Sequence, residues 1–341
     1  MTPMLGIMAS QISGHLVPTA AMAIAGNGST PATVVYPYSV ASGFGTKYTD
    51  PASLAGSSTS IIFNTANTYI AAVDSTSPYI YVHPWTMASG FGTKIANPAT
   101  LPSGQGTSVA FNPAGSVIAM VNANTPFVNA YPWTTGFGTK YANPATLPAD
   151  GSGGVAFNPA GTAIAAGGYT TPFIQVYPWS SGFGTKYANP ATLPTLAVFP
   201  SFNPAGNVIA MSGYTTPFIA AYAWSAGFGT KYTNPATLPG GTTYAPKFNP
   251  AGTVIAIGSV NSPYIQAYPW SAGFGTKYAN PTTLPGTGGT GVAWDSTGST
   301  VAVTTTGSPY LAAYQWSSGF GTKYANPTGI PNTAYSVAFT N

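Results

Sequence analysis

Residues 153–194 read GGVAFNPAGTAIAAGGYTTPFIQVYPWSSGFGTKYANPATLP, and they form one of seven similar segments in a chain of 341 residues. Every copy contains the pentapeptide Gly-Phe-Gly-Thr-Lys, which begins at positions 43, 90, 136, 182, 227, 273 and 319. Successive copies are 45 to 47 residues apart. A fixed period of this length is typical of stacked or circular repeat architectures. We therefore interpret the chain as seven copies of one structural unit rather than as several unrelated domains.

The repeat unit is predicted to contain four strands, a to d in chain order. Its apolar or alternating runs are short and are bounded by Gly, Pro and Asn, as is typical of strands and turns. In residues 153–194, an Asn-Pro-Ala-Gly turn joins a to b, and Gly-Phe-Gly joins c to d. No run has the period or length of a helix. Strand d contains Asn-Pro, and because Pro cannot donate to a ladder, we expect d at the outer edge.

Four short antiparallel strands at this period predict an all-β fold, a seven-bladed β-propeller. The ends of the chain favour a closed ring. The N-terminal part supplies b (20–25), c (33–38) and d (44–54) of one blade, whereas the C-terminal residues 334–340 supply a lone strand a. Pairing these two parts would remove two open sheet edges. We predict a propeller over residues 19–341 and a separate leader over residues 1–18.

The turn between strands a and b carries a resemblance to known propellers. The pattern Val-Ala-Phe-Asn-Pro-Ala-Gly followed by Ile-Ala is similar to the Phe-Ser-Pro-Asp-Gly and Leu-Ala pattern of WD-repeat and YVTN-type propellers. The Trp-Asp dipeptide of WD repeats is replaced here by Tyr-Pro-Trp, so the His–Asp pairing of those repeats is not carried over. The resemblance implies the architecture, and it implies no particular function.

Composition narrows the possible functions. Charged residues make up 4% of the chain, against about a quarter in ordinary soluble domains. The net charge is +4, and Arg, Glu and Cys are absent. The lack of Arg disfavours nucleic-acid binding, and the lack of Cys excludes disulfides and thiolate metal sites. No apolar run reaches the ~18 residues of a membrane span, so membrane insertion is not expected. Because no basic residue precedes Lys47, we expect no secretion signal.

Catalytic and cofactor motifs are not recognisable in the sequence. Acid–base catalysis needs His, Asp, Glu or Cys placed together, but only two His and four Asp occur, without a recurring spacing. Gly-Phe-Gly-Thr-Lys also differs from the phosphate loop Gly-x-x-x-x-Gly-Lys-Thr that precedes a helix. The sequence therefore predicts a protein that is not an enzyme and that has no metal or cofactor.

Two sets of repeated side chains are candidate binding groups. The lysines of the pentapeptide would form a ring that either binds anions or protects the outer strands from edge pairing, and the second interpretation is favoured. This ring comprises Lys47, Lys94, Lys140, Lys186, Lys231, Lys277 and Lys323. The repeated indoles either stack on sugars or pack between blades, and packing is favoured. They are Trp85, Trp133, Trp179, Trp224, Trp270 and Trp316, with Tyr38 in the corresponding place of the incomplete unit.

The loops distinguish one face of the disc from the other. The a–b and c–d turns share one face and are nearly identical among copies, whereas the b–c and d–a loops share the opposite face and vary. Loops on a rigid scaffold commonly determine binding specificity. Any recognition surface is therefore expected on the variable face, with Tyr169, Tyr214 and Tyr244 as candidate contacts. Drift in loops that contact nothing is the alternative.

The leader carries a second resemblance. Its residues Leu5, Gly6, Ile7, Ile12, Ser13, Gly14, His15 and Leu16 lie in a stretch that is similar to the start of many tailed-bacteriophage virion proteins. That resemblance implies a non-enzymatic structural protein, mounted through its leader on other proteins of the tail or capsid. It also implies assembly in the host cytoplasm and a possible contact with a glycan or protein of the host surface. The alternatives are a lectin-like carbohydrate-binding propeller and a bacterial surface or secreted YVTN-type propeller.

Overall fold

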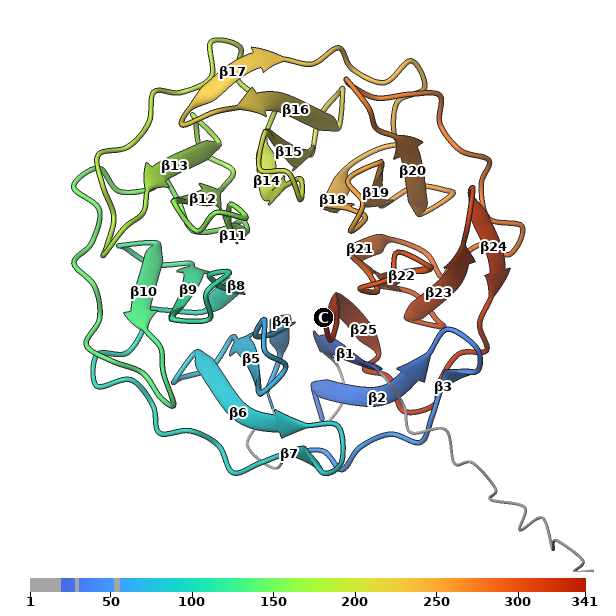
Figure 1. The fold of residues 1–341 in the computed structure, drawn as a ribbon, viewed down its shortest axis with the longest axis horizontal. Coiled ribbons are helices and arrows are strands. Elements are labelled where there is room, and N and C mark those ends of the chain that lie inside the picture. The colour runs from blue at the N-terminus through green and yellow to red at the C-terminus, as the bar shows by residue number, and fades with distance from the viewer. Residues whose placement is uncertain (1–19, 28–30, 52–55) are drawn as a thin grey trace, which may run out of the picture.

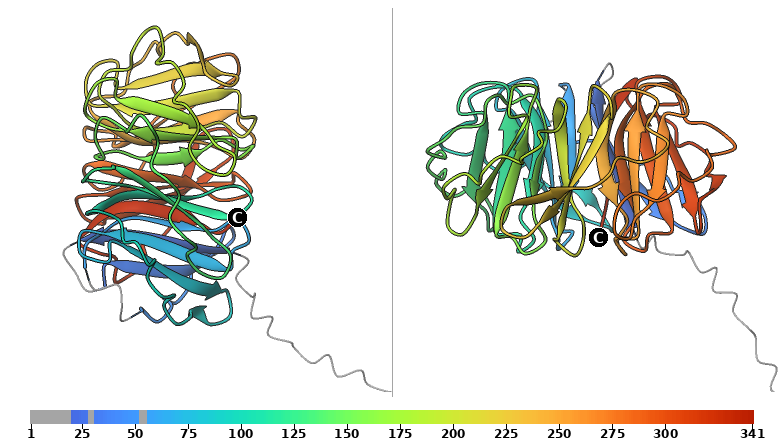
Figure 2. Two further views of the ribbon diagram at one scale, coloured as in Figure 1. Left: turned by 90° about the vertical axis from the view of Figure 1, so that its left-hand side faces the viewer. Right: turned by 90° about the horizontal axis from the view of Figure 1, so that it is seen from above.

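A computed structural model describes residues 20–27, 31–51 and 56–341, which form seven antiparallel sheets arranged as blades around a central channel (Figure 1). The predicted seven-bladed β-propeller is confirmed. Seen from the side, the blades form a disc (Figure 2). The described residues contain no helix, and hence no helix that could span a membrane.

Blades 1 to 6 follow one another along the chain, and within each blade the strands pair in sequence order. Blade 1 contains β4 (Ser58–Phe63), β5 (Tyr69–Asp74), β6 (Ile80–Thr86) and β7 (Gly90–Phe91). Blade 2 contains β8 (Gly106–Phe111), β9 (Val117–Asn122) and β10 (Val128–Pro132). Blade 3 contains β11 (Val155–Phe157), β12 (Ala163–Gly167) and β13 (Ile174–Pro178).

The next three blades continue the same order. Blade 4 contains β14 (Ala197–Phe202), β15 (Val208–Gly213), β16 (Ile219–Trp224) and β17 (Phe228–Lys231). Blade 5 contains β18 (Thr243–Phe248), β19 (Val254–Ser259) and β20 (Ile265–Pro269). Blade 6 contains β21 (Gly289–Trp294), β22 (Thr300–Thr305), β23 (Leu311–Trp316) and β24 (Phe320–Lys323).

Blade 7 closes the ring by joining the two ends of the described chain, as predicted. Its sheet order is β25 (Thr333–Phe339), β1 (Ala20–Asn27), β2 (Thr33–Ser39) and β3 (Gly43–Phe44). β25 and β1 are antiparallel, with Ile24 opposite Val337. Two hydrogen bonds extend the pairing: the Ala21 N–H donates to Thr340 Oγ1, and the Thr340 N–H donates to the Ala21 carbonyl, both at 2.9 Å.

The prediction of four strands in every blade is corrected to three or four. In blades 2, 3 and 5 the outermost strand is reduced to a single bridge, as between Trp179 and Phe183 in blade 3. The d segment begins with glycines, which weaken a strand, and it continues into Asn-Pro, which cannot extend the ladder. The corner glycines of blades 4 and 6 have nearly the same φ as Gly182, 144° and 150° against 145°, and those blades keep the short strands β17 and β24. The outer strand is therefore marginal in every blade.

The Asn-Pro-Ala-Gly turn explains why the a–b hairpin repeats so faithfully. In blade 3, Asn158 Oδ1 accepts hydrogen bonds from the N–H groups of Thr162 and Ala163, both at 2.8 Å. The Gly161 N–H closes the turn on the Asn158 carbonyl at 2.8 Å, with φ at 69°. An Asn side chain that bonds nearby backbone and a Gly at positive φ are what this tight turn requires.

The repeated indoles lie in the core between blades. Trp179 is buried, and its ring makes edge-to-face contacts with Phe157 at 5.5 Å, Phe183 at 4.9 Å and Tyr141 of the preceding blade at 5.1 Å. The other five indoles and Tyr38 are buried in the same way. Their burial leaves no ring face for a sugar, so these aromatic residues contribute to packing.

A second contact ties neighbouring blades at the rim. In six blades, a buried tyrosine of the third strand donates a hydrogen bond to a threonine carbonyl 30 or 31 residues earlier, or across the ring closure, at 2.7 to 3.0 Å. The pairs are Tyr36–Thr328, Tyr131–Thr100, Tyr177–Thr146, Tyr222–Thr192, Tyr268–Thr237 and Tyr314–Thr283. Blade 1 carries His83 at this place, where its Nδ1 lies 3.0 Å from the Gly92 carbonyl oxygen.

Candidate functional site

The central channel is the main cavity of the described chain. It encloses about 940 Å³ and is lined by the first strand of each blade, β4, β8, β11, β14, β18, β21 and β25. Each of these strands ends in a Phe or Trp, and the residue immediately before that aromatic side chain lines the channel. The seven residues at this inward position are Ile62, Ala110, Ala156, Ser201, Lys247, Ala293 and Ala338.

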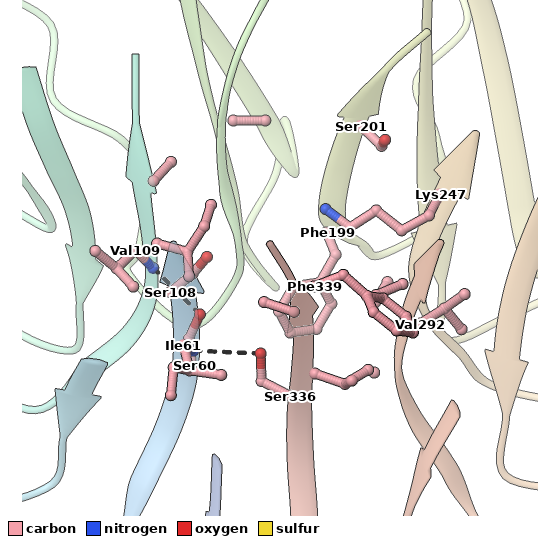
Figure 3. A pocket seen from close by; sticks show the side chains of 18 of the residues that line it. Ser60, Ile61, Ser108, Val109, Phe199, Ser201, Lys247, Val292, Ser336 and Phe339 are labelled. Atoms are coloured by element: carbon pink, nitrogen blue, oxygen red, sulfur yellow. Dashed lines mark hydrogen bonds between the residues drawn. The ribbon is translucent and has the colours of Figure 1, made fainter. Parts of the chain in front are cut away.

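Lys247 is the one cation at this inward position. Its side chain extends from β18 into the channel (Figure 3). The only ion pair among the described residues is Lys47–Asp50 at the rim, so Lys247 has no carboxylate partner there. Desolvation by the surrounding protein lowers the pKa of the Lys247 amine, although water inside the channel reaches the side chain. Lys247 is therefore an unpaired amine in a confined space.

A row of serine hydroxyls faces the channel two residues earlier in three adjacent blades. The residues are Ser336 in blade 7, Ser60 in blade 1 and Ser108 in blade 2. Each hydroxyl oxygen accepts a backbone N–H from the first strand of the next blade: Ile61 at 3.3 Å, Val109 at 3.4 Å and Val155 at 3.1 Å, of which Figure 3 draws the first two. These bonds hold the serines in place, and a hydroxyl that accepts one hydrogen bond can still donate another.

The channel has one acidic residue among its described lining, and that residue has a structural role. Asp295 lies in the a–b turn of blade 6. Its Oδ1 accepts the Thr300 N–H at 2.7 Å, and its Oδ2 accepts the Thr297 hydroxyl at 2.5 Å. No group of three or more metal-ligating side chains occurs in the part of the chain that the structure describes. Of the Lys and Asp side chains among the described residues that line the channel, Lys247 is therefore the one left to contact a ligand.

The three tyrosines predicted on the variable face lie together. Tyr169 and Tyr214 occupy the b–c loops of blades 3 and 4, and Tyr244 belongs to β18 of blade 5. The hydroxyl oxygens of Tyr169 and Tyr214 are 2.5 Å apart, and Tyr214 donates to the Tyr244 hydroxyl at 2.8 Å. Burial, followed by its bonds to the other two hydroxyls, raises the pKa of Tyr214, which remains a neutral phenol.

The predicted lysine ring does not converge on a common point. Six of its lysines donate to an Asn three residues later, as Lys186 does to Asn189 Oδ1 at 2.6 Å. Lys47 pairs with Asp50 in the same way. Each ammonium thus contacts its own outer segment, and protection of the sheet edges remains the interpretation we prefer. The predicted attachment residues of the leader lie outside the described residues.

Sequence reasoning missed Lys247 and the serines as site residues. The signal was present in the alignment of the seven copies on the aromatic residue before each a–b turn. That alignment places a lysine against Ile, Ser and four Ala. Lys247 was overlooked because, among the lysines, only the seven that recur in the pentapeptide were considered as candidate binding groups.

Comparison with solved structures finds other propellers. A protein from Bacteroides uniformis provisionally described as a 6-phosphogluconolactonase superposes with a TM-score of 0.72 at 14% identity, over 94% of this chain and 99% of that one. A counterpart from Bacteroides fragilis with the same description gives 0.74 at 10% identity, over 94% and 98%. The periplasmic gluconolactonase of Pseudomonas aeruginosa gives 0.71 at 13% identity, over 95% and 99%. No protein-family model and no curated protein sequence matches the chain.

These findings correct the function predicted from the sequence. At 10–14% identity the likeness shows the fold. The three neighbours are bacterial proteins described as lactonases, which contradicts the prediction of a non-enzymatic phage virion protein and favours the bacterial-propeller alternative. Nothing in the comparisons supports a phage origin or a WD-repeat family. The prediction rested on a resemblance carried by a short leader motif, and that motif does not concern the channel.

Proposed function

We propose that the chain binds a sugar acid or its lactone in the central channel and hydrolyses the lactone. The observation that carries this proposal is Lys247, a cation without a carboxylate partner at an inward position where the other blades carry Ile, Ala or Ser. The chemical class comes from the neighbours, which are described as lactonases for gluconate-type sugars.

The position of Lys247 suits an electron-rich ligand. The protein around the Lys247 amine disfavours its charged form, although water in the channel reaches the side chain. A carboxylate or phosphate in the channel would stabilise that form, and perturbed amines in a cavity are common at functional sites. The serine hydroxyls of blades 7, 1 and 2 would donate to the oxygen atoms of a polyhydroxylated ligand.

Hydrolysis of a lactone requires few groups. With its pKa lowered by desolvation, Lys247 in its neutral form accepts a proton from water while the water oxygen bonds to the lactone carbonyl carbon. Serine hydroxyls stabilise the negative oxygen of the tetrahedral intermediate. The bond from the carbonyl carbon to the ring oxygen then breaks, and the Lys247 ammonium returns its proton to that oxygen. One lactone and one water give one hydroxy acid.

The test compares two lysines of the same chain. Initial rates of ring opening are measured for δ-gluconolactone and 6-phosphogluconolactone, with the spontaneous rate subtracted. We expect Lys247→Met to lower kcat/KM by about 100-fold or more, the range for a lost general base. Lys277→Met removes a rim lysine and is expected to leave kcat/KM unchanged.

Two results would contradict the proposal. One is a wild-type rate equal to the spontaneous rate for both lactones. The other is a Lys247→Met variant that folds and retains the wild-type rate.

A further inference from the structure

The tyrosine row, defined as Tyr169, Tyr214 and Tyr244, is a continuous surface feature built by three adjacent blades. The ring centroids of Tyr169 and Tyr214 are 4.9 Å apart, and those of Tyr214 and Tyr244 are 5.4 Å apart, both in edge-to-face geometry. Tyr169, at the outer end, is 37% exposed. The backbone is held as well, because the Thr242 hydroxyl donates to the Tyr214 carbonyl at 3.2 Å.

The inner end of the row joins the channel. Tyr244 and Phe199 both line the channel, and their ring centroids are 6.1 Å apart. Tyr244 precedes Lys247 by three residues in β18, with a β-bulge between them. Their pairing partners in β19 are two residues apart, so Tyr244 and Lys247 are separated by about 7 Å along the strand. Tyr214 and Tyr169 lie beyond Tyr244 in the two preceding blades, so a ligand that also covers them is longer than one that ends at Tyr244.

The row also departs from the repeat. Tyr169 and Tyr214 each lie three residues before the proline of a b–c loop. The same place in blades 1, 2, 5 and 6 holds Ser75, Ala123, Val260 and Thr306. The tyrosines thus occur at this place only in blades 3 and 4, the two blades that precede blade 5, which carries Lys247. The loop tyrosines and Lys247 are thus connected through β18, which carries both Lys247 and Tyr244, the residue that hydrogen-bonds to Tyr214.

The chemistry of the row favours a neutral sugar over an ion. Its rings offer aromatic carbon to the C–H groups of a pyranose, and its hydroxyls offer both donors and acceptors. The raised pKa of Tyr169 and Tyr214, due mainly to burial, keeps these groups uncharged. An apolar surface with a few fixed polar groups is the usual composition of a small-molecule subsite.

We propose that the tyrosine row is a subsite for a second sugar residue, so that the preferred ligand is a disaccharide acid or its lactone. This inference rests on the proposed function of the channel, which would hold the acid end near Lys247. The second sugar would extend past Tyr244 toward Tyr214 and Tyr169.

Calorimetric titration tests the subsite with gluconate, cellobionate and lactobionate. We expect both disaccharide acids to bind the wild-type chain more tightly than gluconate. Tyr169→Ala should weaken the disaccharide acids by about tenfold, the size of one aromatic contact, and leave gluconate unchanged. Tyr214→Phe keeps the ring and removes the bridging hydroxyl, and should weaken them less. Val260→Ala, at the equivalent loop position of blade 5, is the matched control and should change neither affinity.

The outcomes separate this inference from the proposed function. If gluconate binds and Lys247→Met abolishes that binding, but the preference for disaccharide acids is absent or survives Tyr169→Ala, the subsite is refuted and the channel proposal stands. If no acid binds, but neutral cellobiose or lactose binds and Tyr169→Ala removes that binding, the row is a sugar site and the channel proposal fails. If no saccharide binds the wild-type chain, both proposals fail.

Discussion

The rim and the channel of the disc are made from the same seven repeats. Equivalent positions at the rim hold the same residue in nearly every blade, whereas those in the channel do not. At the rim, the tyrosine-to-threonine hydrogen bond recurs in six blades, and the indole recurs in six. In the channel, one inward position holds Ile, Ala, Ser and Lys in different blades. Repeated residues here serve an architectural need that every blade shares. The positions at which one blade differs from the other six are therefore more informative about function.

The largest expected effect would come from removing a repeated residue of the blade core. Trp179→Ala deletes an indole that contacts Phe157, Phe183 and Tyr141, and it should lower the free energy of unfolding by about 3–5 kcal/mol. Denaturant titration measures this value. Trp179→Phe, which retains an aromatic ring, should lose less. If Trp179→Ala lowers the free energy of unfolding no more than substitution of an exposed residue does, the repeated residues do not serve the architecture in the way proposed here.

The opposite sign is expected for the residue that departs from the repeat. Lys247→Ala introduces the residue that four other blades carry, and it removes an unpaired amine. We expect it to raise the free energy of unfolding by about 0.5–2 kcal/mol, as consensus substitutions commonly do. The same titration tests this sign. A clear loss of stability would show that Lys247 supports the fold and would weaken its assignment to a site.

A smaller loss of stability is expected when one tyrosine-to-threonine hydrogen bond at the rim is removed. Tyr177→Phe removes the 2.8 Å hydrogen bond to the Thr146 carbonyl and leaves the ring in place. The expected cost is about 0.5–1.5 kcal/mol, the net value of one such bond. The control is Ser180→Ala on the same outer segment, an exposed position where we expect little change. If Tyr177→Phe and Ser180→Ala lower the free energy of unfolding equally, the hydrogen bond between Tyr177 and Thr146 contributes nothing to stability.

The sequence predicted the blades better than it predicted the site, and the physical reasons differ. Asn158 and Gly161 satisfy a turn within a few residues, so local chemistry determined the hairpin and its repetition counted the blades. Ring closure followed from the lone strand at the C-terminal end. The number of strands per blade was wrong in three blades because a ladder through Gly and Asn-Pro depends on small differences in pairing.

The candidate site depended on contacts that sequence distance conceals. Tyr169, Tyr214 and Tyr244 were predicted on one face, but nothing in the sequence indicated their mutual hydrogen bonds, which join three blades across 75 residues. The seven copies already show that Lys247 departs from the repeat, but only the structure shows that its side chain enters the channel. The virion prediction failed because the resemblance behind it was carried by the leader, whereas the comparisons concern the propeller itself.

We propose above that Lys247, in its neutral form, is the group that makes the channel reactive. The most direct measurement is the pH dependence of kcat/KM for δ-gluconolactone, after the rate of Lys247→Met is subtracted at each pH. Because protonated Lys247 cannot accept a proton, the difference should rise with pH and level off above the pKa of Lys247. Desolvation places that pKa below the ordinary value of about 10.5. A difference that is zero at every pH, or that falls as pH rises, would contradict the account.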